Sequence, residues 1–221
     1  MTDIVLIQGL WLKPDVWSEV ERELEVLGHR ASAVDLPDGP NATLADQVAA
    51  VLASADAAGD PPLVVGHSAA ASLAWLAADV RPVAGVVLIG GFPAADGEQY
   101  AGFLPETGAP LAFPGWAEFE GPDSADLDDG LRASVQAAMV TVPDGVAHGI
   151  VRLSNAARYD VPVTLICPEF SPAEAREWIQ GGDVPELAKA TNLTLVDLDS
   201  GHWPMFTQPA ALARLLATAA G

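Results

Sequence analysis

The sequence predicts a single-domain α/β protein built around a parallel β-sheet, and three observations support this. Short apolar runs alternate with amphipathic stretches along much of the chain, which is typical of βαβ units. A length of 221 residues suits one domain with a substantial buried core. Half of the residues are hydrophobic and only 18% are charged, which excludes a disordered chain. We therefore expect one domain over residues 1–221.

The first half of the chain follows the alternation of strands and helices closely. The predicted strands are, in order, Asp3–Ile7, Ala31–Leu36, Leu63–Val65 and Val83–Ile89. A first helix begins after Pro14 and ends at Gly28, since a glycine commonly terminates a helix. A second helix is capped by Thr43. A third, alanine-rich helix is predicted from Ser68 to about Asp79.

The alternation breaks after the fourth strand. Residues 92–160 are rich in Gly, Pro and aromatic residues, and the next clear strand is Pro162–Ile166. A long insertion in a compact domain is usually functional, so we expect these residues to form a cap with mobile edges over a cleft. Two helices are predicted within it, at residues 126–139 and 146–157.

The last part of the chain returns to regular elements. Ser171 and Glu174 form a capping box with Pro172 at the first helical position, which predicts a helix start. The sixth strand is predicted at Leu193–Leu198, and the final helix is predicted to open at Thr207.

The charge balance excludes one class of partner. The 30 acidic residues outnumber the 10 basic ones and give a formal net charge of −20. A field of that sign repels phosphate backbones, so we expect no nucleic-acid partner. The acidic run Asp123–Asp129 lacks the glycine and the terminal glutamate of an EF-hand loop, which favours an exposed loop or a helix start over a calcium site.

Membrane, disulfide and metal classes are also disfavoured. No apolar run reaches the roughly 18 residues that a membrane helix needs. The chain starts with the apolar run Ile4–Ile7 rather than with a basic flank and a cleavage site, so we expect a cytoplasmic protein without a membrane partner. Cys167 is the single cysteine, which excludes an internal disulfide framework and a multi-cysteine metal site. We expect no metal, and the oligomeric state is not predicted.

Residues 63–70 carry the strongest chemical signal. The sequence Leu63-Val64-Val65-Gly66-His67-Ser68-Ala69-Ala70 places a serine in a small-residue turn between an apolar strand and a helix start. Such a turn strains the serine backbone and exposes its hydroxyl, and the helix N-terminus presents N–H groups to a developing oxyanion. The alternative is a serine that only caps the helix. In this context we predict that Ser68 is a nucleophile.

A serine hydroxyl needs an adjacent base with a pKa near the working pH, and four histidines are available. His202 follows the last strand, so its loop reaches the carboxyl edge of the sheet, where Ser68 also lies. His29 precedes the second strand, His67 is expected to point away from Ser68, and His148 lies in the insertion. We predict that His202 is the base.

The carboxylate that orients this base is expected beyond the fifth strand. No aspartate is present between residues 166 and 171, and Ser171 with Glu174 is committed to capping. Glu169 is the first candidate, because its extra methylene lets it reach His202 from a slightly earlier position. Asp96 is the reserve candidate.

The remaining site residues follow from the same geometry. An oxyanion hole needs two backbone N–H groups, for which Leu10 and Ala69 are the predicted donors. If the aromatic residues of the insertion and the rim face the cleft, the pocket is apolar and suits a small hydrophobic acyl group or an aromatic ester. The alternative is that they hold the insertion onto the sheet. The predicted pocket residues are Trp11, Phe92, Phe103, Phe113, Trp116 and Trp203.

Together these features resemble the α/β-hydrolase superfamily, and within it the small cofactor-free esterase and hydroxynitrile-lyase-like branch. The markers are Gln8-Gly9 with Trp17, Gly28-His29, Asp35-Leu36-Pro37, Gly66-His67-Ser68, Val161-Pro162-Val163 and Gly201-His202-Trp203-Pro204. Gln8 stands where relatives commonly have histidine. The resemblance implies a six-stranded parallel sheet in the order 2-1-3-4-5-6, flanked by helices, with a small cap between strands four and five. It also implies that no cofactor is used.

We therefore expect a serine hydrolase, a carboxylesterase that acts on a small hydrophobic ester, lactone or thioester through an acyl-enzyme. Two other classes stay open. A non-hydrolytic lyase of the same fold would need a cationic group near the serine, for which Lys13 is the only candidate. A ligand-binding protein could retain the same three residues as part of a pocket.

Overall fold

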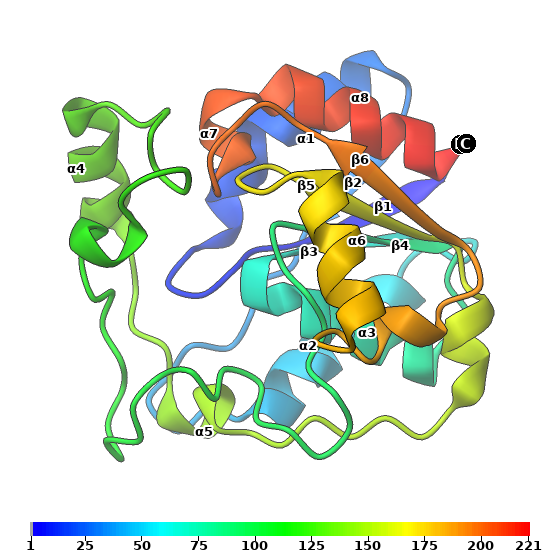
Figure 1. Cartoon of the computed structure of the whole chain (residues 1–221), viewed down its shortest axis with the longest axis horizontal. Helices are drawn as coiled ribbons and strands as arrows, with labels where there is room; N and C mark the ends of the chain where they lie inside the picture. Colours follow the sequence, from blue (N-terminus) through cyan, green and yellow to red (C-terminus); the bar gives the residue numbers. More distant parts are fainter. Residues whose placement is uncertain (1) are drawn as a thin grey trace.

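The computed structural model describes residues 2–221, and a six-stranded β-sheet forms its centre (Figure 1). The strands are β1 (Asp3–Ile7), β2 (Arg30–Ala33), β3 (Leu63–His67), β4 (Gly85–Ile89), β5 (Val163–Cys167) and β6 (Leu193–Asp197). All neighbouring pairs are parallel, in the order β2-β1-β3-β4-β5-β6. The sheet order that the resemblance implies is thus confirmed.

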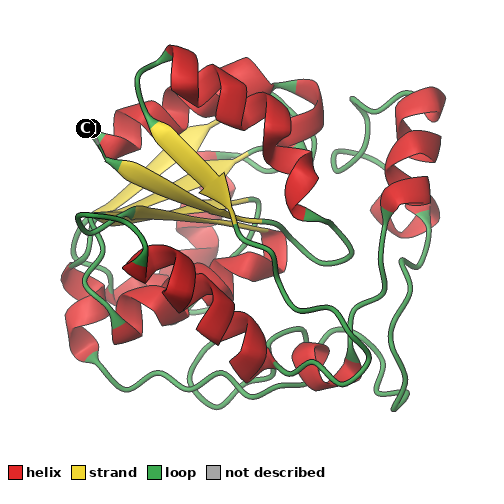
Figure 2. Cartoon of the chain, turned by 180° about the vertical axis from the view of Figure 1, so that it is seen from behind, coloured by secondary structure: helices red, strands yellow, loops and turns green. Residues whose placement is uncertain are grey.

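The sheet lies between two layers of helices, as Figures 1 and 2 show. The helices are α1 (Ser18–Val26), α2 (Leu44–Asp56), α3 (Ala71–Val80), α4 (Asp129–Ala138), α5 (Asp144–Ala147), α6 (Pro172–Gly181), α7 (Pro204–Thr207) and α8 (Pro209–Ala220). Helices α1 and α8 pack together on one face, and α2, α3 and α6 cover the other. None of the helices between residues 2 and 221 combines the length and the apolar character that crossing a membrane requires.

The continuous apolar character of the strands follows from burial on both faces. In β1, Ile4 and Leu6 belong to the core beneath α1 and α8, whereas Val5 and Ile7 belong to the core beneath α2 and α3. A parallel sheet covered on both sides needs apolar side chains at successive positions, so its strands read as unbroken runs.

The predicted helix starts are confirmed where side chains cap them. Thr43 accepts a hydrogen bond from the backbone of Asp46, whose carboxylate in turn accepts one from the backbone of Thr43. Ser171 and Glu174 form the same reciprocal pair at the start of α6. Each pair satisfies two N–H groups that a helix N-terminus leaves without a partner.

Several predicted boundaries were wrong, and two of the differences have a clear physical reason. The second strand ends at Ala33 rather than at Leu36, because β2 is an edge strand that pairs only with β1, and β1 itself ends at Ile7. The final helix begins at Pro209 rather than at Thr207. Thr207 ends the short helix α7, and proline suits the first position of a helix because no backbone N–H is needed there.

The insertion (residues 92–160) differs most from the sequence prediction. The helix predicted at residues 126–139 is present as α4, and Asp128 caps it. The helix predicted at residues 146–157 was wrong: α5 ends at Ala147, and the next helical residues belong to a short 3₁₀ turn that begins at Ala156. Beyond α5 the backbone pairs with the segment 97–101, for example through the N–H of Val151 and the carbonyl of Glu98 (2.8 Å). Pairing with a distant segment replaces the local hydrogen bonds of a helix.

A buried ionic network anchors the end of the insertion to the helical layer. Arg158 forms ion pairs with Asp79 on α3 (3.0 Å) and with Glu186 (2.8 Å). Asp79 also accepts hydrogen bonds from the backbone N–H groups of Ser154 and Asn155. All three charged side chains are buried, and their multiple partners compensate for the loss of hydration.

Candidate active site

Ser68 lies at the turn where β3 becomes a helix. A short 3₁₀ turn, Ser68–Ala70, follows the strand and leads into α3. Ser68 has a backbone φ of 55°, in the left-handed region that costs a non-glycine residue about 1–3 kcal/mol. A Cβ on Gly66 would lie 2.2 Å from the carbonyl oxygen of Ala70, so only glycine allows this close return of the chain. Strand, strain and small residues thus occur together, as a nucleophile elbow requires.

His202 and Glu169 form a hydrogen-bonded pair at the same edge of the sheet. Nδ1 of His202 lies 2.7 Å from Oε1 of Glu169, and both side chains are largely buried. The carboxylate fixes the tautomer and the orientation of the ring, which leaves Nε2 available for proton transfer. Among the hydrogen bonds of residues 2–221, none joins the Ser68 hydroxyl to His202. Such bonds are often long in unliganded enzymes and tighten when substrate is bound.

The other histidines have different environments. His67 is fully buried, and its Nε2 donates a hydrogen bond to the carbonyl oxygen of His202 (2.7 Å). Burial, with His202 close by, lowers the pKa of His67 to about 3, so His67 stays neutral and cannot serve as a base near neutral pH. His148 contacts Asp144 and the carbonyl of Leu104 within the insertion.

Asp96, the reserve acid, accepts a hydrogen bond from the backbone N–H of Leu153 (2.9 Å), so it joins two parts of the insertion. The catalytic roles of Ser68, His202 and Glu169 remain predictions. The structure places Glu169, and not Asp96, in a hydrogen bond with His202.

Two aspartates of the acidic run hold the loop of His202, Asp123 through its backbone carbonyl and Asp126 through its carboxylate. The carbonyl of Asp123 accepts a hydrogen bond from the backbone N–H of His202 (2.7 Å). Oδ2 of Asp126 accepts bonds from the backbone N–H of Gly201 (2.8 Å) and from the hydroxyls of Thr207 (2.6 Å) and Ser200 (3.2 Å). The acidic run 123–129 therefore includes a contact between the insertion and the base loop, beside the helix cap that its composition predicts.

Asp123 also influences the charge balance of the site. Burial raises the pKa of its carboxyl group, the positive charge of His202 opposes that shift, and the negative charge of Glu169 adds to it. The Asp123 carboxyl group therefore interacts electrostatically with both His202 and Glu169. No sequence motif marks this position, because the contact joins residues about eighty positions apart along the chain.

The loop after β1 lies against Ser68 at Gly9, the residue before the predicted oxyanion donor Leu10. A Cβ on Gly9 would lie 3.1 Å from Cβ of Ser68, so the two loops are in close contact. Trp11 has a φ of 64°, and its carbonyl accepts a hydrogen bond from Val140 of the insertion (2.9 Å). The second predicted donor, Ala69, follows Ser68 at the start of the 3₁₀ turn.

The predicted pocket residues divide into two groups. Phe92 and Phe103 line a cavity of about 310 Å³ that includes Ser68 and Tyr100. Phe113, Trp116 and Trp203 form an aromatic cluster with Phe119 and Trp11, with ring centroids 5.1–6.2 Å apart. This cluster connects the insertion to the loop of His202, since Trp203 also packs edge-on against the His202 ring. Phe92 and Phe103 thus border the cavity of Ser68, and the cluster joins the insertion to the loops of Trp11 and His202. That these residues contact the substrate stays a prediction.

The arrangement provides a strained serine, a histidine with a carboxylate partner, and backbone N–H groups on two adjacent loops. This set can perform acyl transfer, in which a serine hydroxyl attacks a carbonyl group. Across residues 2–221, no group of three or more His, Cys, Asp or Glu side chains is arranged to hold a metal ion.

Comparison with known proteins gives a family and several structural neighbours. The model of the alpha/beta hydrolase family matches residues 4–215. An extracellular alpha/beta-hydrolase from a Paenibacillus species has a TM-score of 0.78 at 16% identity, over 99% of each chain. A methylesterase from Arabidopsis has a TM-score of 0.77 at 14% identity, over 99% of this chain and 98% of the other. A pyrethroid hydrolase from Sphingobium faniae JZ-2 has a TM-score of 0.69 at 22% identity, over 99% and 97%.

At these identities the structural likeness concerns the fold. A search of curated protein sequences finds no significant match.

Proposed function

Because the chain belongs to the alpha/beta hydrolase family, we propose that it is a carboxylesterase that hydrolyses small hydrophobic esters through an acyl-enzyme on Ser68. Lactones and thioesters present the same reacting carbonyl group and belong to the same class of substrate. Two proteins of similar fold bear the names methylesterase and pyrethroid hydrolase, and this supports ester chemistry as the first choice.

The observation that carries the proposal is the pair between Glu169 and His202, at the same sheet edge as the strained Ser68. In the proposed reaction, the Ser68 oxygen attacks the ester carbonyl while Nε2 of His202 takes its proton. Glu169 stabilises the resulting imidazolium, and the N–H groups of Leu10 and Ala69 stabilise the oxyanion. His202 then protonates the leaving alkoxide, and a water molecule, activated by the same histidine, hydrolyses the acyl-enzyme.

The test is hydrolysis of p-nitrophenyl acetate and butyrate by the wild type and by Ser68→Ala. Loss of the nucleophile should lower turnover on the order of a thousandfold or more, with the circular dichroism spectrum unchanged. A fluorophosphonate should label the wild type and not Ser68→Ala. Ser134→Ala is a matched control, because Ser134 is exposed on α4 and should retain wild-type activity and labelling.

The outcomes separate the classes considered from the sequence. Comparable activity in Ser68→Ala would remove Ser68 as the nucleophile. Labelling of Ser68 without hydrolysis of either ester would favour a lyase of this fold. Absence of both labelling and hydrolysis would favour a ligand-binding protein.

A further inference from the structure

The turn after β1 contains a strained residue of its own. Among the non-glycine residues between 2 and 221, only Trp11 and Ser68 have a positive φ, of 64° and 55°. The N–H of Leu12 donates to the carbonyl of Gly9 (3.4 Å), so the chain forms a β-turn here with Trp11 at its third position. A turn with a positive φ at that position normally has glycine or asparagine there. A bulky residue keeps such a conformation only where the surrounding structure holds it.

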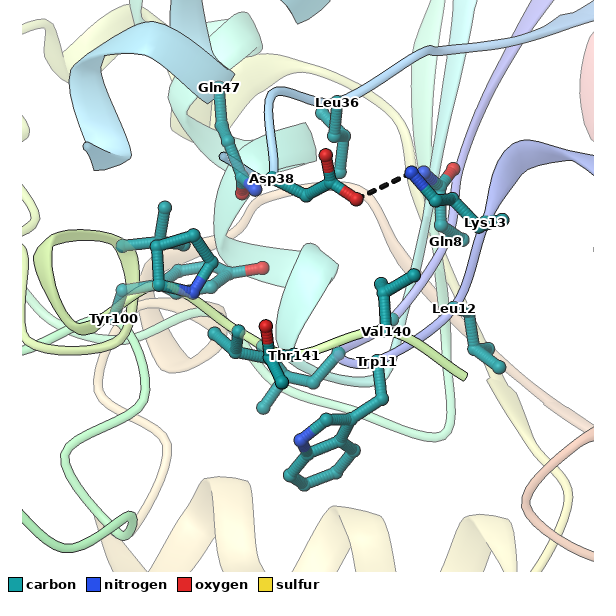
Figure 3. A pocket seen from close by; sticks show the side chains of 15 residues that line it. Gln8, Trp11, Leu12, Lys13, Leu36, Asp38, Gln47, Tyr100, Val140 and Thr141 are labelled. Atoms are coloured by element: carbon teal, nitrogen blue, oxygen red, sulfur yellow. Dashed lines mark hydrogen bonds and ion pairs between the residues drawn. The ribbon is translucent and has the colours of Figure 1, made fainter. Parts of the chain in front are cut away.

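The insertion supplies the contacts that hold Trp11. The backbone N–H of Val140 donates to the carbonyl of Trp11 (2.9 Å), and Figure 3 shows the two residues side by side. Nε1 of Trp11 donates to the carbonyl of Leu111 (3.2 Å), and the ring packs edge-on against Phe113. Leu111 and Val142 exchange two backbone hydrogen bonds (2.7 and 2.9 Å), so the two segments that hold Trp11 also hold each other. The backbone and the side chain of Trp11 are therefore both fixed by the insertion.

The surroundings of Trp11 differ from those of a residue that lines the cavity of Ser68. Trp11 is only 7% exposed, and other residues, among them Phe92 and Phe103, line that cavity. The indole N–H is already bonded to the carbonyl of Leu111 and is not free to bind a substrate. These contacts favour a role in holding the turn over a role in the wall of the cavity.

Leu10 lies between two fixed points of this turn. On one side, a Cβ on Gly9 would lie 2.7 Å from Nδ1 of His67 and 3.1 Å from Cβ of Ser68, so Gly9 has no room to move toward the elbow. On the other side is Trp11. Rotation of Trp11 to a negative φ would turn the peptide between Leu10 and Trp11 and displace the N–H of Leu10, the proposed oxyanion donor. Such a donor is effective only where its position matches the developing charge.

We propose that Trp11 is a positioning residue: the insertion holds its indole N–H and its carbonyl, and thereby keeps the strained turn in the conformation that presents the N–H of Leu10 to the oxyanion. This inference rests on the proposed function, because it assumes an oxyanion formed at Ser68 and a donor at Leu10. The insertion then contributes to the geometry of the reaction as well as to the choice of substrate.

The test compares Trp11→Ala with Trp11→Gly in the hydrolysis of p-nitrophenyl acetate and butyrate. Both variants lose the indole contacts, but glycine adopts a positive φ without strain, whereas alanine favours relaxation to a negative φ. Removal of an oxyanion donor lowers kcat by about 100- to 1,000-fold, so its displacement in Trp11→Ala should lower kcat about thirtyfold, and Trp11→Gly should lose about fivefold. KM should stay within about twofold of the wild type, because the effect concerns the transition state.

The order of the two variants separates positioning from packing. Glycine removes more apolar surface than alanine, so a residue that only packed or lined the cavity would lose more in Trp11→Gly, or would change KM. The amplitude of fluorophosphonate labelling gives the concentration of competent sites, so partial unfolding is distinguished from slower turnover.

Trp11→Phe is the conservative variant, since it removes the indole N–H and keeps an aromatic ring. It should lower kcat/KM about threefold and weaken inhibition by a trifluoromethyl ketone, which forms a tetrahedral oxyanion with a serine, by the same factor. Trp75→Phe is the matched control, because it also removes a buried indole hydrogen bond, to Glu186 (2.9 Å), but lies on α3. It should retain the wild-type kcat and the wild-type affinity for the ketone.

Wild-type kcat in the Trp11 variants, or activity in Trp11→Ala equal to or above that in Trp11→Gly, would overturn the inference and leave the proposed esterase function intact. If neither of these two variants folds, Trp11→Phe decides, and an unchanged affinity for the ketone would overturn the inference. Absence of hydrolysis and labelling in the wild type would overturn the proposed function, and this inference with it.

Discussion

The insertion meets the base and the nucleophile at two places, and the two contacts differ in kind. Beside the base, residues 119–126 hold the loop Ser200–Trp203 through hydrogen bonds and aromatic packing. Beside the nucleophile, residues 99–103 border the cavity of Ser68, and Phe103 there is 74% exposed. We call residues 119–126, which hold the base loop, the brace, and residues 99–103, which border the cavity of Ser68, the open wall. Regions with few buried contacts are the ones that open at low cost, so any lid-like motion should be confined to the open wall.

The brace packs closely against the base loop at Gly201. A Cβ on Gly201 would lie 2.3 Å from Oδ1 of Asp126 and 2.5 Å from the carbonyl oxygen of Asp123. On the opposite side, His67 donates its hydrogen bond to the carbonyl of His202. The base loop is therefore fixed from the insertion and from the core, as a proton-transfer group requires.

Within this comparison the largest effect is expected from Asp126→Ala, which removes two hydrogen bonds to the base loop and one to Thr207. Displacement of a catalytic group by about 1 Å can cost on the order of a hundredfold in rate, so kcat should fall by about that factor while KM changes little. Asp126→Asn, which keeps an acceptor, should lose less. The second-order rate of fluorophosphonate labelling should fall in parallel with kcat.

Asp128→Ala is the control for this change, since Asp128 caps α4 in the same segment without contacting the base loop. It should cost about 1 kcal/mol of stability and leave kcat near the wild-type value. If both variants lower kcat equally, the segment 123–128 has only a structural role, and the brace does not act through His202.

A smaller, pH-dependent effect is expected from His67. Its pKa is about 3 in the folded protein and 6.5 in the reference state, so the unfolded chain binds the proton first as the pH falls. The folded state therefore loses stability between about pH 6.5 and pH 3, by roughly 3 kcal/mol from pH 6.5 to pH 4. Urea unfolding at pH 7 and pH 4 should show a smaller loss of stability in His67→Gln than in the wild type.

His148 contributes to the pH dependence of stability with the opposite sign. Its hydrogen bond to the carbonyl of Leu104, together with Asp144, raises its pKa above 6.5. Its contribution to stability is present below that pH and is lost as the pH rises through the folded pKa. His148→Gln should therefore increase the loss of stability toward pH 4. Equal pH profiles for the wild type and both variants would contradict the buried, neutral state of His67.

The smallest effect is expected from Phe103→Ala on the open wall. An exposed side chain contributes little to stability, so the midpoint of thermal unfolding should stay within about 2 °C of the wild type. Loss of apolar contact with the substrate should raise KM for p-nitrophenyl butyrate about threefold, and for the acetate less.

Trp116→Ala is the contrasting variant in the aromatic cluster. Because Trp116 is a predicted pocket residue, this change should shift the preference toward bulkier esters. The cluster contacts add an expected loss of about 3–5 kcal/mol in stability. A large loss of stability in Phe103→Ala, or none in Trp116→Ala, would contradict the division of the insertion into open wall and brace.

The features that the sequence predicts correctly are those that depend on residues close together along the chain. The strand before Ser68 and the capping boxes are each visible within a few residues, and Glu169 and His202 each follow a strand that is predicted locally. The role of Asp126 is not visible in this way, because Asp126 acts on a loop seventy-five residues away along the chain. The helix predicted at residues 146–157 was wrong for the same reason, since pairing with residues 97–101 decides that region.

The ionic network of Arg158 has a consequence for how this fold could diversify. Its partners lie outside the insertion, on α3 and in the connection between α6 and β6, so the network joins the scaffold to a segment that could be exchanged. Transplanting residues 92–153 from another family member would leave this network whole. A transplant that also replaced Arg158 would leave two buried carboxylates without their cation. This would lower the stability of the fold by about 3–5 kcal/mol. The boundary for building chimeras, and for recombination during evolution, therefore lies before Ser154.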